Sequence, residues 1–211
     1  RILGDKAQNL ETAIEAFQLA LTVYTREDFR VQWATTQNNL GAAYSDRILG
    51  DKAENIETAI EAFQLALTVR TREDFPVDWA VTQNNLGAAY RERILGDKAQ
   101  NLETAIKAYQ LALTVLTRED FRVDWAMTQN NLGNAYRERI LGDKAQNLEA
   151  AIEAYEKALT VYTREDFPVD WAGTQNNLGN AYCDRIQGDK AENLEARSEE
   201  RRVGKECTLR C

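Results

Sequence analysis

The sequence repeats with a constant period of 46 residues. The segment RILGDKA begins at Arg1, Arg47, Arg93 and Arg139, and RIQGDKA follows at Arg185. Four full copies are nearly identical, and a truncated copy runs from 185 to 196. A unit of this length cannot bury its apolar face alone and is stabilised by stacking on its neighbours. Residues 1–196 are therefore expected to form one array of stacked units.

Each unit has the pattern of two helices of about 20 residues. Asp74 is the expected N-cap of a helix over 75–95, and Gly96, just after the start of the next copy, is the expected stop. The segment DKAQ at 97–100 is a capping-box pattern that opens another helix, which carries apolar residues at helical spacing and ends near Thr117. No segment alternates strictly between apolar and polar residues. The predicted fold class is all-α.

Two motifs in each unit resemble the tetratricopeptide repeat family. They are LGAAY at 40–44 and AIEAF at 59–63, and both recur in every full copy, with Tyr109 and Tyr155 replacing the phenylalanine. Two features depart from the family pattern. Gln37 stands where the family has a tryptophan, and the period exceeds the usual length of about 34 residues. The long units look like those of kinesin light chains and of bacterial signalling proteins. The resemblance implies an α-solenoid of antiparallel helix pairs.

Composition disfavours several classes of function. Lys plus Arg number 26 against 34 for Asp plus Glu, a net charge of −8, which disfavours nucleic acid as a partner. The chain has no histidine and no apolar run long enough to span a membrane. Its carboxylates recur in every copy, whereas a catalytic site needs distinct roles. We expect no enzymatic activity, no cofactor, no metal and no membrane partner, and we expect a cytoplasmic location.

The C-terminal end of the chain does not follow the repeat. Residues 197–211, RSEERRVGKECTLRC, have no period, and 197–207 match the translation of a widely used sequencing adapter. We interpret this tail as an artefact and exclude it from the fold, the alternative being a genuine basic C-terminus. The chain also starts inside a unit, which indicates part of a longer protein. Uncapped ends of such an array would allow end-to-end self-association.

Differences between the copies concentrate at a few positions of the first helix in each unit. The broadest variation is at position 35 and its equivalents, followed by position 45 and by position 24 at the end of the preceding helix. On a helical wheel, positions 35, 38, 39, 42 and 45 share one face. The opposite face carries Trp33, Leu40 and Tyr44, which we interpret as the core between helices. The variable face is then expected to meet solvent or a ligand.

The family resemblance implies that this face lines a concave groove that binds a partner. The implied groove residues are Thr35, Asn38, Asn39, Ala42, Ser45, Val81, Asn84, Asn85, Ala88, Arg91, Met127, Asn130, Asn131, Asn134, Arg137, Gly173, Asn176, Asn177 and Asn180. A ladder of asparagine amides can pair with the N–H and C=O groups of an extended peptide. Arg91 and Arg137 could anchor a carboxylate. Alternatively, some of the asparagines bridge neighbouring helices or repeats.

The predicted function is a scaffold that binds a protein or peptide segment. An alternative is a spacer, or a self-assembling regulatory arm of a larger signalling protein. A clamp for chaperone tails is less favoured, because it needs Lys and Arg at several groove positions where this chain has Thr, Val, Met, Gly, Ala and Asn.

Overall fold

The computed structural model describes residues 5–185, and every regular element in that part is a helix. The helices are α1 (Lys6–Leu21), α2 (Arg30–Asp46), α3 (Lys52–Leu67), α4 (Pro76–Glu92), α5 (Lys98–Leu113), α6 (Arg122–Glu138) and α7 (Lys144–Leu159). An eighth helix occupies 168–185. The predicted all-α class is confirmed. The interpreted tail, 197–211, lies outside the described residues.

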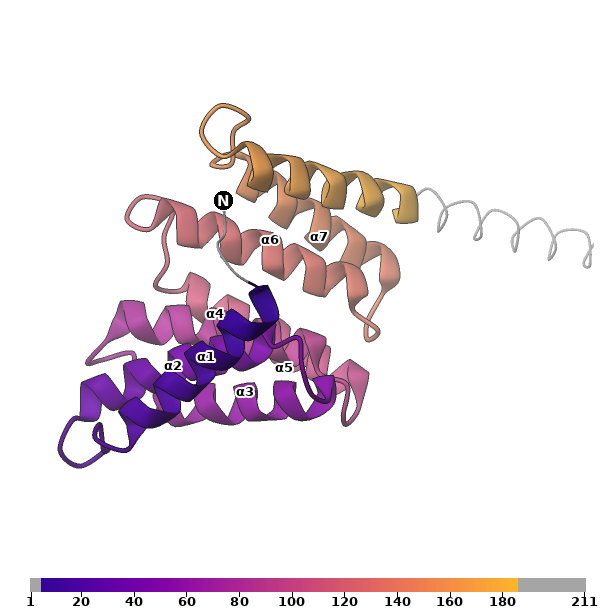
Figure 1. Cartoon of the computed structure of the whole chain (residues 1–211). Helices are drawn as coiled ribbons and strands as arrows, with labels where there is room; N and C mark the ends of the chain where they lie inside the picture. Colours follow the sequence, from indigo (N-terminus) through magenta and orange to yellow (C-terminus); the bar gives the residue numbers. More distant parts are fainter. Residues whose placement is uncertain (1–4, 186–211) are drawn as a thin grey trace, which may run out of the picture.

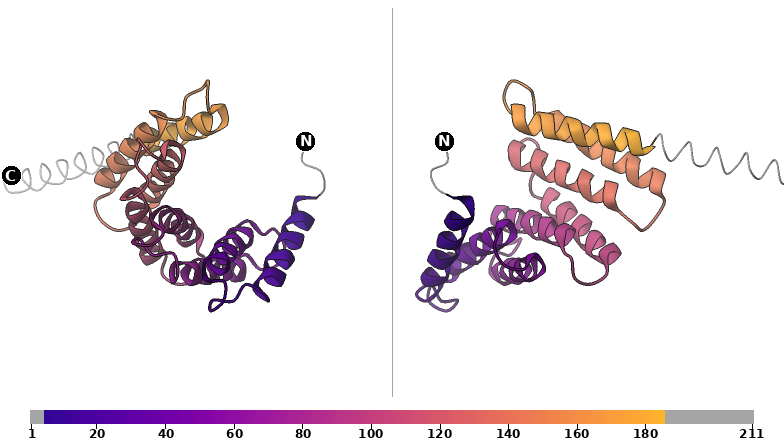
Figure 2. Two further views of the ribbon diagram at one scale, coloured as in Figure 1. Left: turned by 90° about the vertical axis from the view of Figure 1, so that its left-hand side faces the viewer. Right: turned by 45° about the vertical axis from the view of Figure 1, so that its right-hand side comes forward.

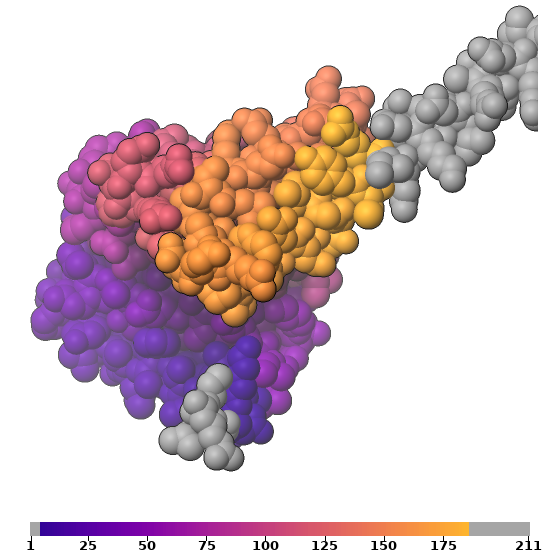
Figure 3. All heavy atoms as spheres, turned by 90° about the horizontal axis from the view of Figure 1, so that it is seen from above, coloured from indigo at the N-terminus to yellow at the C-terminus, as the bar shows by residue number. Residues whose placement is uncertain are grey.

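The helices form a curved array in which alternate helices occupy two layers (Figures 1 and 2). The helices α2, α4 and α6 contact one another in succession, whereas no contact joins α1 to α3, α3 to α5 or α5 to α7. Helices on the inside of a curve approach each other more closely than those on the outside. We therefore name α2, α4, α6 and 168–185 the inner helices, and α1, α3, α5 and α7 the outer helices. In the space-filling view, the last described helices lie over the earlier ones (Figure 3).

The outer helices begin at an aspartate cap, as expected. The Asp97 carboxylate accepts a hydrogen bond from the Gln100 N–H at 2.9 Å, and Asp51 and Asp143 cap α3 and α7 in the same way. The helix α5 ends at Leu113 instead of near Thr117. Its C-cap, Thr114, donates its hydroxyl to the Leu111 carbonyl at 2.7 Å and so satisfies one of the last helical acceptors.

The inner helices are shorter than expected at both ends. The N-cap of α4 is Phe75 and not Asp74, whose own N–H is bound by the Thr71 hydroxyl. The helix stops at Glu92, three residues before the expected end, because Arg93 leaves the helical conformation. Gly96 is part of the following loop, where its φ of +79° favours glycine.

An inner helix and the outer helix that follows it pack closely because a glycine faces an aromatic ring. A Cβ added at Gly41 would lie 2.8 Å from the ring of Phe63, and Gly87 and Gly133 face Tyr109 and Tyr155 in the same manner. Around these contacts lie buried apolar clusters. One comprises Ile56, Ala59, Ile60, Phe63, Leu86 and Ala89.

The stripe interpreted as core is only partly enclosed. Leu40, Leu86 and Leu132 are buried, but all four tryptophans are only half-buried. Trp79 packs against Ala112 and Leu116, and the Arg72 guanidinium lies 5.8 Å from the centroid of its ring. The interpretation of the tryptophans as core is therefore only partly correct: they lie in the first turns of the inner helices, where Trp79, Trp125 and Trp171 pack against core clusters but stay partly exposed.

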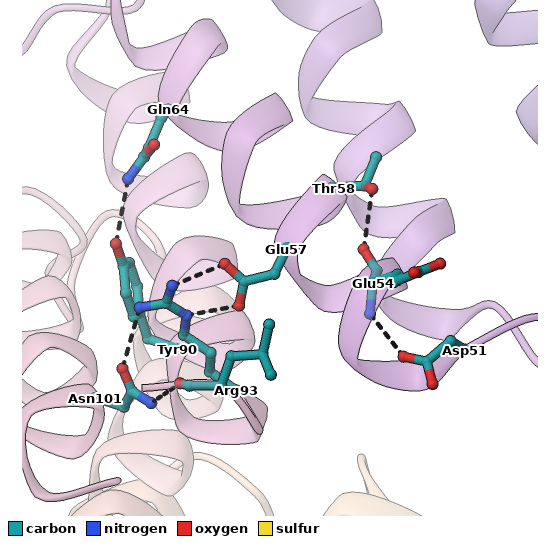
Figure 4. A network of polar contacts seen from close by, with 9 residues as sticks. Asp51, Glu54, Glu57, Thr58, Gln64, Tyr90, Arg93 and Asn101 are labelled. Atoms are coloured by element: carbon teal, nitrogen blue, oxygen red, sulfur yellow. Dashed lines mark hydrogen bonds and ion pairs between the residues drawn. The ribbon is translucent and has the colours of Figure 1, made fainter. Parts of the chain in front are cut away.

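A polar cluster that we name the arginine clamp joins three successive helices (Figure 4). Arg93 donates to both carboxylate oxygens of Glu57 on α3, at 2.7 Å each, and to Asn101 on α5 at 3.4 Å. Asn101 in turn donates to the Leu95 carbonyl at 2.9 Å. The clamp recurs around Arg47 and Arg139. Each copy ties an outer helix to the following inner–outer pair.

We predict that Glu57→Gln lowers the free energy of unfolding by about 1–2 kcal/mol at pH 7, the usual value of a charge-assisted hydrogen bond. The hydrogen bond from Arg93 holds the pKa of Glu57 below its ordinary value of 4.5. This contribution is therefore present above that value and is lost as the pH falls below it. Urea unfolding from pH 7 to pH 3 measures the difference, with Glu61→Gln on the exposed side of α3 as the control. A difference that does not depend on pH would contradict this assignment.

We also predict that Trp79→Ala lowers the free energy of unfolding by about 2–3 kcal/mol. This is no more than the smallest loss usual for a fully buried tryptophan. The side chain is already partly exposed in the folded protein, so the substitution removes less buried apolar surface than it would at a fully enclosed site. In an array stabilised by neighbouring contacts, the damage should stay near the second repeat. Hydrogen exchange of the α4 and α5 amides measures this, and an unchanged unfolding midpoint would show that Trp79 contributes no packing.

Candidate functional site

Two positions of the predicted groove face are accessible on each inner helix. Thr35 and Ala42 are exposed on α2, and Gly173 and Asn180 are exposed on 168–185. Their equivalents on α4 and α6 are partly exposed: Val81, Ala88, Met127 and Asn134. We name these eight residues the groove floor. They are the predicted groove residues at position 35, position 42 and the equivalents of these two positions.

The asparagine pairs are not on the groove floor. Asn38 and Asn84 are buried, with exposed fractions of 8% and 3%, and the expectation that they meet solvent is wrong. Asn130 is partly buried, whereas Asn39 and Asn176 are exposed on the first and last inner helices. A wheel drawn for one helix omits the inner helices on either side, which cover the flanks of the variable face.

These asparagines form a ladder of side-chain hydrogen bonds between neighbouring inner helices. Asn85 donates to Asn38, Asn131 to Asn84 and Asn177 to Asn130, each at 3.2 Å. In each pair, the second asparagine donates its amide N–H and the first accepts with its Oδ1. The bridging alternative therefore describes the free protein. Within residues 5–185, the amide nitrogens of Asn84 and Asn130 donate to no protein group, so each retains donors for another acceptor.

Some of the residues that differ between copies contact each other across neighbouring repeats, and their side chains are complementary. The Arg70 side chain is buried between α2 and α4, where it donates to the hydroxyls of Thr82 at 2.9 Å and Thr35 at 3.1 Å. Its nearest carboxylate is Asp78, at 3.5 Å. Burial lowers the pKa of Arg70, and Asp78 opposes that shift. Arg70 is the equivalent of Tyr24, a position that differs between the copies, and it contacts Thr35. The sequence did not indicate that these two variable positions are linked.

The same two columns meet again further along the array. Met127, the equivalent of Thr35, packs against the cluster that contains Tyr162, the equivalent of Arg70. A polar residue therefore faces the arginine at one junction, and an apolar residue faces the tyrosine at another. Variation at these positions is explained by matching across a junction, before any partner is considered.

A second pair of variable positions forms a side-chain hydrogen bond in one repeat and lacks it in another. The Tyr155 hydroxyl donates to Asn134 Oδ1 at 2.8 Å. In the preceding repeat the corresponding residues are Tyr109 and Ala88, and the Tyr109 hydroxyl is buried with no hydrogen-bond partner. Asn134 thus belongs both to the groove floor and to the contact with the outer helix.

The two arginines expected to anchor a carboxylate already lie near acidic side chains. Arg91 is 3.8 Å from Glu92, and Arg137 is 3.8 Å from Asp184. Both arginines are partly buried, and Ser45 in the same column is partly buried with an unpaired hydroxyl. Their geometry leaves little uncompensated positive charge in the groove.

Residues 5–185 hold no group of three His, Cys, Asp or Glu side chains that could bind a metal ion. None of the helices in this part is long and apolar enough to cross a membrane.

The matching at the first junction predicts a measurable coupling between Thr35 and Arg70. Thr35→Val should cost about 1 kcal/mol, because the buried guanidinium loses an acceptor. The double variant Thr35→Val with Arg70→Leu recreates the Val81 and Leu116 combination of the next junction. It should be at least as stable as the wild type, since apolar residues often replace buried charges without loss. Denaturant unfolding of both single variants and the double variant gives the coupling energy, and additive effects would contradict the pairing.

Comparison with known proteins finds one family. The sequence model of the tetratricopeptide repeat family matches residues 171–202, which include Leu178, Gly179 and Tyr182 of the LGxxY motif. No curated protein matches the chain. The family match and the succession of inner and outer helices over residues 5–185 lead to one identification: the chain is a repeat protein of the tetratricopeptide type.

Proposed function

We propose that the chain is a protein-interaction scaffold whose concave groove binds an extended or helical segment of another protein. Tetratricopeptide repeats generally mediate protein–protein interaction. The observation that carries the proposal is the groove floor: its residues are small or uncharged, and they remain at least partly accessible, whereas Asn38, Asn84 and the leucines of the LGxxY motifs of α2, α4 and α6 are buried. Solenoids use such concave surfaces for binding.

The asparagine ladder supports a role in holding a polypeptide backbone. Asn130 is partly exposed and has used its amide oxygen within the ladder, but its nitrogen still carries unused donors. A bound segment supplies backbone carbonyl oxygens that can accept from these donors. The ladder would then hold the inner helices in place and present a fixed donor group, so that little side-chain freedom is lost on binding.

The groove floor favours a partner segment with few charges. Val81 and Met127 are apolar, Ala88 is small, and Asn134 is neutral. The acidic side chains near Arg91 and Arg137 weaken the attraction of those arginines for a partner carboxylate. We propose that the partner segment is neutral where it crosses α4 and α6, and that it belongs to a protein and not to nucleic acid or a membrane.

The test uses a displayed library of random peptides of about twelve residues, selected on the immobilised chain. Asn130→Ala should weaken binding of a selected peptide by about 1–3 kcal/mol, measured by fluorescence polarisation. The same substitution removes the acceptor of Asn177, so we expect it also to lower stability by about 1 kcal/mol.

Gln110→Ala is the matched control. It also removes one side-chain hydrogen bond, that of 2.9 Å to Tyr136 on the face of α6 opposite the groove floor, so its effect on melting should be similar. Its effect on peptide binding should be negligible. Equal losses of binding in the two variants would reduce the Asn130 effect to stability alone. Failure to select any peptide that competes for the groove would contradict the scaffold function and favour the spacer.

A further inference from the structure

We number the repeats by the pair of an inner helix and the next outer helix: α2 with α3, α4 with α5, and α6 with α7. In the second of these repeats, one buried polar group has no hydrogen-bond partner. Tyr109 on α5 has an exposed fraction of 0%, and its hydroxyl lacks a hydrogen-bond partner within the described part of the chain. A buried hydroxyl without a partner destabilises the folded state. Such a group needs an explanation, and the neighbouring repeats supply a direct comparison.

The repeats on either side avoid this cost in two different ways. In the first repeat the ring is Phe63 and the facing residue is Ala42, so no hydroxyl is present. In the third repeat, the Tyr155 hydroxyl donates to the Asn134 side chain at 2.8 Å. Only the second repeat combines the tyrosine with an alanine, Ala88.

The phenol ring takes the same path in the second and third repeats. A Cβ added at Gly87 would lie 2.8 Å from the Tyr109 ring, and one added at Gly133 would lie 2.6 Å from the Tyr155 ring. We therefore place the Tyr109 hydroxyl beside Ala88, as the Tyr155 hydroxyl lies beside Asn134. Ala88 belongs to the groove floor and is partly exposed, whereas the Tyr109 hydroxyl is closed to water in the free protein. A bound segment approaches from the groove at Ala88 and reaches the hydroxyl once the side chains that cover it move aside.

The surrounding charges favour a neutral acceptor. Among the nearby charges, Arg91 acts most strongly on the Tyr109 hydroxyl, and the acidic Glu92 and Glu138 oppose it. Because these charges oppose each other, they provide no dominant attraction for a carboxylate at this position. The acceptor used in the third repeat is itself neutral, the amide oxygen of Asn134.

We propose that Ala88 and Tyr109 form a subsite of the groove for a carboxamide side chain, Asn or Gln, of the bound polypeptide. The amide oxygen of that side chain accepts the hydrogen bond of the Tyr109 hydroxyl, as Asn134 does for Tyr155. Ala88 carries no amide group, so the partner supplies the amide at the place where Asn134 supplies it to Tyr155. This inference rests on the proposed function of the groove.

The experiment uses peptides selected from the random library on the wild-type chain. We expect enrichment of Asn or Gln at one peptide position. Tyr109→Phe should weaken a selected peptide about five- to tenfold, the effect of one neutral hydrogen bond. Ala88→Asn should weaken it at least as much, because the new side chain occupies the subsite and accepts from Tyr109. Replacing the enriched amide by alanine should have no further effect on affinity for Tyr109→Phe.

Both variants reproduce combinations that the chain already contains, Ala42 with Phe63 and Asn134 with Tyr155, so both are expected to fold. Melting should show both variants at least as stable as the wild type. Tyr136→Phe is the matched control: it removes a hydroxyl that accepts from Gln110 on the outer side, and it should change affinity less than twofold.

The outcomes separate this subsite from the function on which it rests. Peptides that bind Tyr109→Phe and the wild type equally, and still lose affinity with Asn130→Ala, would overturn the subsite and leave the scaffold function standing. The same result would arise if the hydroxyl bound only a trapped water. Selection of no groove-binding peptide would overturn both.

Discussion

The contact between a glycine of each of the inner helices α2, α4 and α6 and an aromatic ring of the next outer helix determines the spacing on which the rest of the structure depends. At Gly41, Gly87 and Gly133 there is no room for a Cβ, so any larger residue would push the two helices apart. The same contact carries the ring past the inner helix toward the groove. As a result, the residue at the groove floor and the tip of the aromatic side chain meet, and the packing core and the binding surface share side chains.

Much of the fold could be predicted from the sequence because its determinants are local and repeated. The aspartate caps and the LGxxY motif act within one helix or one helix pair, and both appear in the structure. The helix ends could not be placed as well. The end of α4 depends on Arg93, which leaves the helix to bind Glu57 and Asn101 from two other helices. Glu57 and Arg93 recur at a fixed separation in the copies, and that signal was available but has no meaning without the superhelix.

The groove could be predicted only in outline, since a helical wheel treats each helix alone. It placed Asn84 and Ala88 on the same face, but the neighbouring inner helix covers the first and leaves the second accessible. Variation between copies was also ambiguous evidence. Thr35 differs from its equivalents at a position that contacts Arg70, so its difference matches a neighbour. The two explanations can be separated only by comparing the residues at both contacting positions in every copy. Residues that change together across a contact between repeats are explained by that contact, and the others remain candidates for contact with a partner.

Because the array is stabilised by contacts between neighbours, binding and stability are linked through the same side chains. Asn130 illustrates this: its oxygen ties α6 to the helix 168–185, and its nitrogen is the donor proposed for the partner. A substitution there changes both quantities, and affinity alone does not reveal which role was lost. Tyr109 is the opposite case, since its hydroxyl contributes no hydrogen bond to the free protein. Removing it costs the fold nothing, so a loss of affinity at this position reports on the partner directly.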